Sequence, residues 1–317
     1  MTRVLVTGGS GFLGSSVVPA LVGEVDAVVS GDIRLPPSPR EGVEEVELDV
    51  TDASLVSSVV AEHRIDTIVH LASIVNPPPG MTEETARRVD VDGTRHVVEA
   101  ALEHGVKRLI VSSSGAAYGY HADSPRWITE DEPVRGNPEF AYSRHKAMVE
   151  EMLRGVREVH PELEQTIFRI GTILGETVDN QITDLFRRDR LLKIRGADSP
   201  FVFIWDTDLT AIVVQAVVGD VTGIFNVAGD DALTVDDIAW TLGKPTRTIP
   251  EPVLRWALAI ARPLRLTQYG PEQTKFLQYR PVLDNQRLKD EFGYTPQLTS
   301  IDAFDAWVAS HPSATSH

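Results

Sequence analysis

The sequence predicts an α/β fold of the Rossmann type, a doubly wound parallel sheet with helices on both faces and a smaller C-terminal lobe. Two patterns carry this prediction. Short β-branched runs alternate with longer helical patterns through the first half of the chain, and the first run leads directly into a glycine-rich turn. The runs are apolar on both faces, as buried parallel strands are. The alternation weakens after Gly171, so the later residues are expected to form most of the smaller lobe.

The expected elements follow in order along the chain. Strands are predicted at the β-branched clusters, which lie at 4–6, 27–29, 43–48, 67–69, 108–112 and 165–170. Helices are predicted where apolar residues recur at helical spacing, at 12–21, 55–62, 85–104 and 142–160. In the second half, two further strands are predicted at 201–204 and 224–227, with a helix at 209–218.

These elements divide the chain into two expected units. Residues 1–171 form a dinucleotide-binding domain, and the chain returns to its sheet near 201–228. Residues 172–200 and 229–317 form a substrate-binding lobe. Proline clusters at 36–39 and 77–79 mark loops after strands and not linkers between domains.

Composition limits the expected partners. The 317 residues, 42% of them hydrophobic, suffice for one large core or for a principal domain with a smaller one. A formal net charge of −16 repels polyanions, so neither nucleic acid nor an anionic membrane is an expected partner. The chain has no cysteine and its nine histidines show no compact ligand spacing, so no metal site is expected. Without a signal-peptide pattern, the chain is expected in the cytoplasm.

The opening turn has the pattern of a dinucleotide-binding site. Gly8 permits the tight turn, Gly11 lets backbone amides approach a pyrophosphate, and Gly14 allows the helix to pack closely on the strand. Phe12 and Leu13 lie between the last two glycines and belong to the same expected cofactor site. The alternative is a glycine-rich turn that only changes the direction of the chain.

Carboxylates after the next two strands extend the expected site. Asp32 lies where the ribose hydroxyls of the adenosine half should be, and its charge would oppose a 2′-phosphate, which favours NAD over NADP. Arg34 close by weakens that preference, and a solvated loop acid is the alternative for Asp32. Asp49, which precedes Val50, would meet the adenine amino group or, equally, cap the helix after Thr51.

The fourth strand is followed by residues whose backbone can run beside a cofactor. They are Leu71, Ala72 and Ser73. Packing alone would also explain their small size.

A tyrosine and a lysine four residues apart begin the helix predicted at 142–160. Tyr142 and Lys146 share one face of it, and a nearby ammonium lowers the pKa of a phenol from about 10 toward the working range of a base. The preceding strand ends in Ser112, Ser113 and Ser114 at the carboxyl edge of the sheet, where a hydroxyl can hold a substrate oxygen near the phenol. Chance spacing on a helix and a strand-ending turn are the alternatives.

Together these motifs resemble those of the extended short-chain dehydrogenase/reductases, the NAD-dependent epimerase/dehydratase family. The shared features are the glycine triplet, Asp32, the serine-rich turn before Tyr118-Gly119, the Tyr142/Lys146 pair, and the segments 168–175, 203–208, 226–229 and 284–296. The resemblance implies that NAD is the cofactor, that Tyr142 is the acid/base, and that Lys146 lowers its pKa and holds the nicotinamide ribose. It implies that Ser114 orients the substrate oxygen, with Ser113 as the alternative. It also implies a homodimer through the helices near 85–104 and 142–160.

Departures from the family pattern narrow the expected function. Dehydratases of the family have Thr, Asp and Glu where this chain has Ser114, Gly115 and Ala116, so dehydration is not expected. Sugar-nucleotide epimerases have Asn and Arg, both contacting the diphosphate, where Thr172 and Phe201 stand. These two replacements weaken the case for a diphosphate substrate.

A further departure is at position 90, where this chain has Asp90 in place of the family's helix asparagine. The replacement leaves open how protons or water molecules are arranged around it.

The preferred expectation is an NAD-dependent oxidoreductase that moves hydride between nicotinamide and a secondary alcohol or ketone, with Tyr142 as acid/base. A nucleotide-sugar 4-epimerase that retains its NAD is the first alternative, and net NADH production separates the two. A dinucleotide binder without catalysis is the second, against which the intact Ser114, Tyr142 and Lys146 argue.

The substrate pocket is expected between the Ser114/Tyr142 edge and the C-terminal lobe. Its expected lining comes from residues 77–81, 171–175 and Phe201. With phenylalanine in place of arginine, a neutral or moderately apolar alcohol is the better guess. The cations whose convergence would restore a diphosphate site are Lys193, Arg195 and Lys275.

Overall fold

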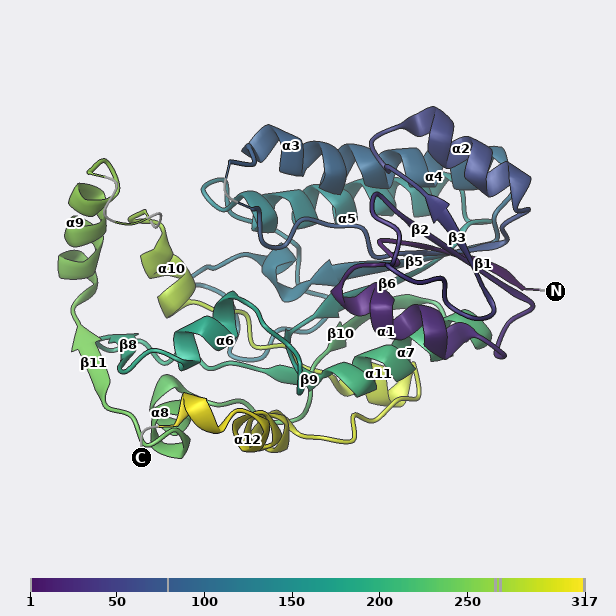
Figure 1. Ribbon diagram of the computed structural model, residues 1–317. Helices are drawn as coiled ribbons and strands as arrows, with labels where there is room; N and C mark the ends of the chain where they lie inside the picture. Colours follow the sequence, from purple (N-terminus) through teal and green to yellow (C-terminus); the bar gives the residue numbers. More distant parts are fainter. Residues whose placement is uncertain (1, 79, 265–266, 268–269, 316–317) are drawn as a thin grey trace.

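The computed structural model describes residues 2–78, 80–264, 267 and 270–315. Its centre is a seven-stranded sheet in the order β10-β6-β5-β4-β1-β2-β3, in which each neighbouring pair is parallel (Figure 1). The strands are β1 (Arg3–Thr7), β2 (Ala27–Asp32), β3 (Val43–Glu47), β4 (Thr67–His70), β5 (Arg108–Ser114), β6 (Glu164–Ile170) and β10 (Gly223–Val227). The predicted Rossmann-type parallel sheet is confirmed.

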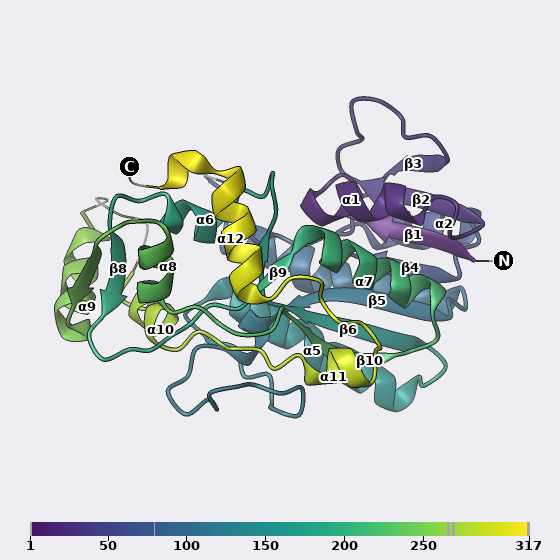
Figure 2. The same ribbon diagram turned by 90° about the horizontal axis from the view of Figure 1, so that it is seen from below.

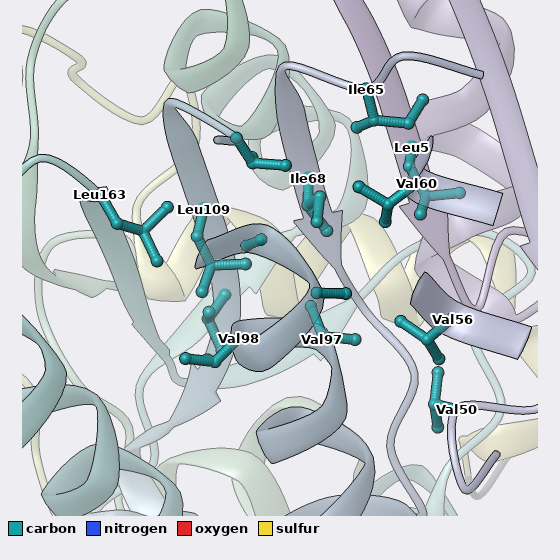
Figure 3. Packing of buried hydrophobic residues seen from close by; sticks show 14 of the residues in the cluster. Leu5, Val50, Val56, Val60, Ile65, Ile68, Val97, Val98, Leu109 and Leu163 are labelled. Carbon is teal, nitrogen blue, oxygen red and sulfur yellow. The ribbon is translucent and has the colours of Figure 1, made fainter. Parts of the chain in front are cut away.

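Helices cover both faces of this sheet (Figures 1 and 2). One face is covered by α2 (Ala53–Glu62), α4 (Gly93–Glu103) and α5 (Ala141–Val159). The other is covered by α1 (Phe12–Leu21), α7 (Asp206–Val218) and α11 (Gln286–Asp290). On the first face, Leu5 and Leu109 of the strands pack with Val56 of α2 and Val97 of α4 (Figure 3). Each such fully buried side chain stabilises the fold by about 1.5–3 kcal/mol.

The strand order fixes where a ligand can bind. β1 pairs with β2 on one side and with β4 on the other. The sheet therefore grows first from β1 through β2 to β3, and then in the opposite direction from β4 onward. In folds of this kind, ligands bind at the carboxyl ends of the strands where the order reverses, which here are β1 and β4. The glycine turn follows β1, and the serine-rich turn follows β5 at the same edge of the sheet.

The smaller lobe lies at one end of the molecule (Figure 2). Its two-stranded sheets pair β7 (Thr172–Leu174) with β9 (Phe203–Trp205) and β8 (Leu191–Ile194) with β11 (Thr246–Ile249). Its helical elements are α6 (Gln181–Phe186), α8 (Val235–Thr241), α9 (Glu251–Ala261), α10 (Gln273–Gln278), α12 (Ser300–Ser310) and η3 (Pro312–Ala314). A cluster of buried rings, Phe186, Phe201, Phe203, Phe304 and Trp307, forms its core.

Three parts of the chain differ from the sequence-based expectation. The predicted helix at 85–104 is α3 (Glu83–Arg87), a π-helical turn η1 (Arg88–Asp92) and then α4. The run at 201–204 yields β9, which pairs with β7, so the chain returns to the large sheet at β10 and not near 201. The short β7, β8 and β11 were not predicted, because their few residues show little periodicity. Within the described ranges, no helix combines the length and the apolar character needed to cross a bilayer.

Candidate active site

The glycine turn packs so closely against neighbouring backbone that side chains would not fit at two of its glycines. Gly8 has a φ of +71°, and a Cβ there would lie 2.7 Å from the backbone nitrogen of Ala72. A Cβ on Gly14 would overlap the carbonyl oxygen of Gly8. Gly11 begins α1 without a side-chain cap, so the first amides of the helix are free of a local acceptor. Phe12 is about half exposed beside this turn, and Leu13 packs partly against the core.

Asp32 lies at the end of β2, directly beside the glycine turn. Its carboxylate accepts hydrogen bonds from the backbone amides of Ser10 at 3.0 Å and Arg34 at 3.1 Å. Sequence reasoning missed Arg40, whose guanidinium donates to the carbonyl of Gly9 at 3.0 Å and forms an ion pair with Glu45 at 2.7 Å. The Arg40 partner lowers the pKa of Glu45. Because Arg40 already has a carboxylate partner, Asp32 remains the group expected to decide cofactor preference.

We expect Asp32→Ala to narrow the preference for NAD over NADP, because it removes the negative charge that would oppose a 2′-phosphate. Titrating the protein with NADH and NADPH and following cofactor fluorescence measures both dissociation constants. The natural chain should bind NADH more tightly. Asp26→Ala, which removes a carboxylate outside the turn, is the matched control and should leave the ratio unchanged. Equal or tighter NADPH binding by the natural chain would contradict the assignment of Asp32.

Asp49 and Val50 lie in the turn between β3 and α2. Asp49 accepts hydrogen bonds from the amide of Thr51 at 2.8 Å and from its hydroxyl at 2.7 Å. The cap of α2 is Asp52, which accepts from the amides of the first turn. The alternative in which Asp49 caps the helix is therefore wrong, whereas its contact with adenine stays a prediction. The Val50 side chain packs in the core.

The residues after β4 pass directly beside the glycine turn. Leu71 donates its amide to the carbonyl of Thr7 at 3.1 Å, and Ala72 closes against Gly8. The hydroxyl of Ser73 donates to the carboxylate of Asp90 at 2.9 Å, so this side chain has a polar partner and does more than pack.

Three groups with acid/base potential meet at the carboxyl edge of the sheet. Tyr142 and Lys146 lie in the first turns of α5, with the Lys146 Nζ 5.7 Å from the centre of the Tyr142 ring. Lys146 donates to the carbonyl of Ser112 at 2.8 Å. The hydroxyl of Ser114 accepts from the amide of Ala116 at 3.1 Å, which starts the turn η2 (Gly115–Tyr118). It also lies close enough to the Tyr142 phenol to lower the pKa of that phenol.

Burial dominates the electrostatics of this group. It raises the pKa of Tyr142 above its usual range, an effect that the Ser114 hydrogen bond opposes and the charge of Asp90 reinforces. Burial also lowers the pKa of Lys146, against the charges of Asp90 and Glu150. Both effects disfavour charge in a dry site. Burial thus opposes the lowering of the Tyr142 pKa that was expected from Lys146.

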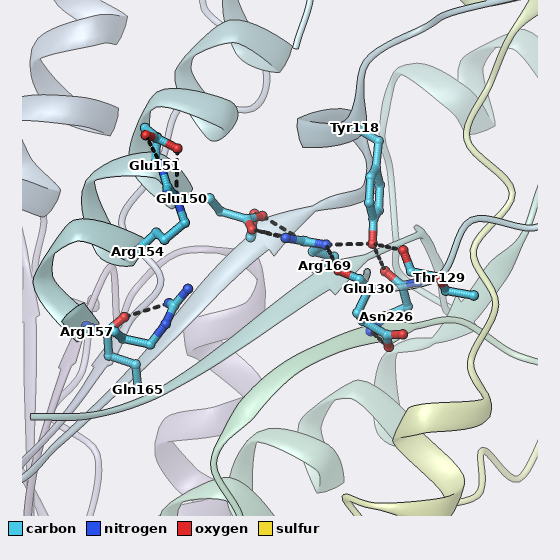
Figure 4. Close-up of polar contacts among 11 residues, drawn as sticks. Tyr118, Thr129, Glu130, Glu150, Glu151, Arg154, Arg157, Gln165, Arg169 and Asn226 are labelled. Atoms are coloured by element: carbon cyan, nitrogen blue, oxygen red, sulfur yellow. Dashed lines mark hydrogen bonds and ion pairs between the residues drawn. The ribbon is translucent and has the colours of Figure 1, made fainter. Parts of the chain in front are cut away.

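The structure separates the roles of the two candidate serines. Ser113 donates its hydroxyl to Glu150, which also receives three hydrogen bonds from Arg169, the shortest at 2.7 Å. Arg169 continues to the hydroxyl of Tyr118 at 2.8 Å (Figure 4). This buried network takes up the Ser113 hydroxyl, whereas the Ser114 hydroxyl is free of it and acts on the pKa of Tyr142. The geometry thus favours Ser114 as the residue that meets a substrate oxygen.

A buried cation that sequence reasoning missed lies next to Phe201. The Arg280 guanidinium is 3.8 Å from the centre of the Phe201 ring and 5.4 Å from that of Phe276. It donates to the carbonyl of Ser199, while its Nε has no partner in the described part of the chain. Arg280 is 9% exposed and forms no ion pair with a carboxylate of the described residues. Burial lowers its pKa to about 9, so it remains a cation at neutral pH.

Arg280 faces a cavity of about 340 Å³ in the smaller lobe. The lining residues come from segments 193–194, 196–199 and 234–236, with Leu277 and Arg280. The Tyr120 ring connects this region to the catalytic edge, since it packs on Phe276 at 5.4 Å and interacts electrostatically with both Tyr142 and Arg280.

The cations named from the sequence do not converge on this cavity. Lys193 lines it but is paired with Asp236, and Lys275 is paired with Glu139. Arg195 is exposed. The sequence suggested that no cation lies near position 201. That expectation is wrong, because the Arg280 guanidinium lies over the Phe201 ring.

The predicted lining of the substrate pocket at the Ser114/Tyr142 edge stays a prediction. Phe201 lies beneath Arg280, but residues 171–175 and the described residues of 77–81 do not line the cavity. Pro79 lies outside the described residues. Thr172 is half-buried in β7 and donates its amide to the carbonyl of Val202 at 3.2 Å, and its contact with a substrate stays a prediction. One feature of the sequence could have drawn attention to Arg280: it stands just before segment 284–296, which resembles the corresponding segment of the family.

Comparisons with known proteins agree with this arrangement. The model of the "NAD dependent epimerase/dehydratase family" matches residues 4–207. An uncharacterized protein of Mycobacterium tuberculosis is 26% identical over 313 residues, which cover 95% of this chain and 82% of the relative. The UDP-glucose 4-epimerase of Azospirillum brasilense is 35% identical over 180 residues, 55% of this chain and 49% of that enzyme.

Two solved structures share the fold over almost the whole chain. The enzyme WbmG of Bordetella bronchiseptica, in complex with NAD and UDP, has a TM-score of 0.74 at 21% identity, covering 99% of this chain and 95% of that one. The UDP-glucose 4-epimerase of Thermotoga maritima, with UDP-glucose, has a TM-score of 0.75 at 19% identity, covering 98% and 99%. At these identities the likeness concerns the fold.

Proposed function

The chain belongs to the NAD-dependent epimerase/dehydratase family, and from that premise we propose that it binds NAD and oxidises or reduces a secondary alcohol or ketone carbon of its substrate. The observation that carries this proposal is the meeting of the Ser114 hydroxyl, the Tyr142 phenol and the Lys146 ammonium at the carboxyl edge of the sheet. The intact constellation argues against a binder without catalysis.

The cradle after β1 fits the cofactor. Side chains at Gly8 or Gly14 would clash with the backbone of Ala72 or of Gly8, so glycine keeps this turn tight. The tight turn brings the first turn of α1 close to where a pyrophosphate would lie. Asp32 stands where the adenosine ribose would be, and the backbone of Leu71 and Ala72 closes the other side. Bound NAD supplies a hydride acceptor in one direction and a hydride donor in the other.

The residues of this chain supply the proton chemistry. In oxidation, the Tyr142 phenolate takes the proton of the substrate hydroxyl as the hydride leaves the same carbon, and in reduction the phenol returns that proton to the oxygen. The Lys146 ammonium stabilises the phenolate. The Ser114 hydroxyl donates to the substrate oxygen and holds it beside Tyr142. No residue of the chain needs to bond covalently to the substrate.

Arg280 supports a substrate that carries a diphosphate. A guanidinium that is buried without a carboxylate, beside an open cavity, is a costly arrangement unless an anion completes it. Diphosphates are matched to the planar fork of arginine. The relatives whose names mention UDP or UDP-glucose agree with this choice. We therefore favour a nucleotide-diphosphate sugar over a small neutral alcohol, which makes a 4-epimerase with retained NAD the leading form of the activity.

One assay separates the forms of this activity. Purified protein with NAD is given UDP-sugars or simple alcohols, while NADH absorbance and the sugar products are followed together. An interconverted sugar without net NADH is expected and would identify an epimerase. Net NADH with a UDP-sugar would identify a dehydrogenase. Turnover of simple alcohols without binding of UDP-sugars would contradict the diphosphate proposal.

The larger organisation also stays a proposal. The division into a nucleotide-binding domain (1–171, with β10) and a substrate-binding lobe is supported by their separate hydrophobic clusters. A homodimer through the surfaces of α4 and α5 is proposed from the family resemblance, and light scattering of the purified chain tests it.

A further inference from the structure

Helix α9 of the smaller lobe exposes an apolar face to solvent. The structure describes every residue of α9, and all of its exposed side chains except Arg255 are apolar. The largest are Val253, Trp256 and Ile260, which share one face because they stand three and four residues apart, and Trp256 is 68% exposed. Leu264, just beyond the helix, is exposed as well. We call these four residues the apolar face of α9. Solvated helix faces are normally polar, so this face indicates a partner.

The packing of α9 uses its other side. Leu254 is buried, and Leu258 and Ala261, four and seven residues further on, are half-buried. The helix that contacts α9 is α10, and Figure 1 shows the pair at the end of the lobe that lies away from the large sheet. A partner can therefore reach the apolar face without any rearrangement of the lobe.

The segments around α9 are basic in an acidic chain. Segments 187–197 and 244–264 contain nine lysines and arginines against two aspartates and glutamates, whereas the whole chain has 30 against 46. The segments lie side by side, because β8 pairs with β11 and β11 leads into α9. The formal net charge of −16 argued against an anionic membrane, but it is an average over the chain, and these segments carry the opposite sign.

Several of these cations are free to meet an external anion. Arg188, Arg190, Arg195 and Arg247 are exposed, and none of them has an ion pair among the residues that the structure describes. Arg195 lies beside the start of α9, since its amide donates to the carbonyl of Ile249 at 3.0 Å.

Two further arginines, at either end of the helix, are partly neutralised. Arg255 is paired with Glu251 at 3.6 Å, and Arg262 with Glu272 at 3.2 Å. The positive charge available to a partner therefore comes mainly from the exposed arginines of β8, β11 and the turn before β8.

The combination of an apolar face and free cations selects among partners. An apolar face alone would suit a protein or a membrane. A symmetric contact between two copies of this chain would bring the same cations opposite one another, which opposes that contact. A bilayer that contains anionic lipids offers an apolar layer to the Trp256 face and negative headgroups to the arginines at once. Tryptophan is also enriched at the membrane–water interface.

We propose that α9 docks the protein on the surface of an anionic lipid bilayer. The apolar face enters the interfacial layer, and the arginines around it lie over the headgroups. With 11 residues, α9 lies in the plane of the surface and does not cross it, because a span needs about 20. This docking goes beyond the proposed reaction and does not depend on it.

Co-sedimentation of the full chain with lipid vesicles tests the proposal. The vesicles contain phosphatidylcholine alone or an equal mixture of phosphatidylcholine and phosphatidylglycerol, and the bound fraction is measured as the lipid concentration rises. The natural chain is expected to bind the mixed vesicles at least about tenfold more tightly than phosphatidylcholine. Added salt should weaken this binding, because it screens the arginines from the headgroups.

Trp256→Ser/Ile260→Ser tests the apolar contact. It removes most of the apolar face and leaves the packed side of α9 in place, so the affinity for mixed vesicles should fall about tenfold or more. Trp240→Ser is the matched control, since Trp240 is 88% exposed but belongs to α8, and it should bind as the natural chain does. Titration with NADH should give the natural affinity for both variants, which shows that they are folded.

Arg247→Glu tests the headgroup contact. Reversing this exposed charge should weaken binding to mixed vesicles about fivefold or more and leave binding to phosphatidylcholine alone nearly unchanged. Lys107→Glu is the matched control, because it makes the same change of charge at an exposed residue just before β5, outside the lobe, and should have little effect.

The proposal is overturned if the natural chain does not bind the mixed vesicles, or if it binds them no better than phosphatidylcholine. It is also overturned if Trp256→Ser/Ile260→Ser binds as the natural chain does, if Trp240→Ser loses as much affinity, or if Arg247→Glu behaves as Lys107→Glu. Should the natural chain ignore vesicles while Trp256→Ser/Ile260→Ser dissociates an oligomer in light scattering, the apolar face is a contact between copies of the chain.

Discussion

Tyr142→Phe is expected to reduce turnover by about 10² to 10⁴-fold while leaving the affinity for NAD nearly unchanged. The substitution deletes the hydroxyl that exchanges the substrate proton and keeps the ring, so the cofactor cradle at the glycine turn is untouched. Steady-state rates with the sugar substrate measure the first effect. Titration of NADH fluorescence measures the second.

Two variants make this result interpretable. Tyr279→Phe removes a hydroxyl from a half-buried tyrosine at the end of α10 and should keep normal turnover. Lys146→Ala should impair both turnover and NAD affinity, because Lys146 acts on the phenol and, by the family resemblance, on the nicotinamide ribose. A near-normal rate for Tyr142→Phe would place the chemistry elsewhere in the chain.

The parts of the site that follow from local patterns could be predicted from the sequence. Helix α1 spans the predicted residues 12–21 because the glycine turn sets its start and its apolar face is regular. Ser114 and Tyr142 could be expected to meet because parallel strands bring their carboxyl ends to one edge of the sheet. In both cases the information lies within a few residues or in the general geometry of the fold.

The parts that depend on contacts between distant segments could not be predicted. Phe201 was interpreted as the loss of a cation, but the guanidinium that covers it comes from Arg280 in another segment of the lobe. Asp49 was expected to be one possible cap of the next helix, but the residue that caps α2 is Asp52. The orientation of Asp90 depends on His145, which the sequence places far from it.

Arg280→Leu is expected to weaken binding of UDP to the NAD complex by about 30-fold or more, because truncating one partner of a buried charge contact costs about 2–5 kcal/mol. Isothermal titration with UDP measures the change. Arg280→Lys should give an intermediate loss, since an ammonium keeps the charge but not the planar fork that binds two phosphate oxygens. Arg195→Leu removes an exposed cation of the same lobe and should leave the affinity unchanged.

The stability of the same variant tells a ligand-binding role from a structural one. In the natural chain the Arg280 guanidinium is compensated by the Ser199 carbonyl and two aromatic rings, with an Nε that lacks a partner in the described residues. A leucine there would remove an incompletely paired buried charge, so the melting temperature of the ligand-free protein should hold or rise. If Arg280 serves only the packing of Phe201 and Phe276, Arg280→Leu should instead melt earlier and bind UDP as the natural chain does. That combination of results would contradict the proposal of a diphosphate substrate and would favour a small neutral alcohol as the substrate.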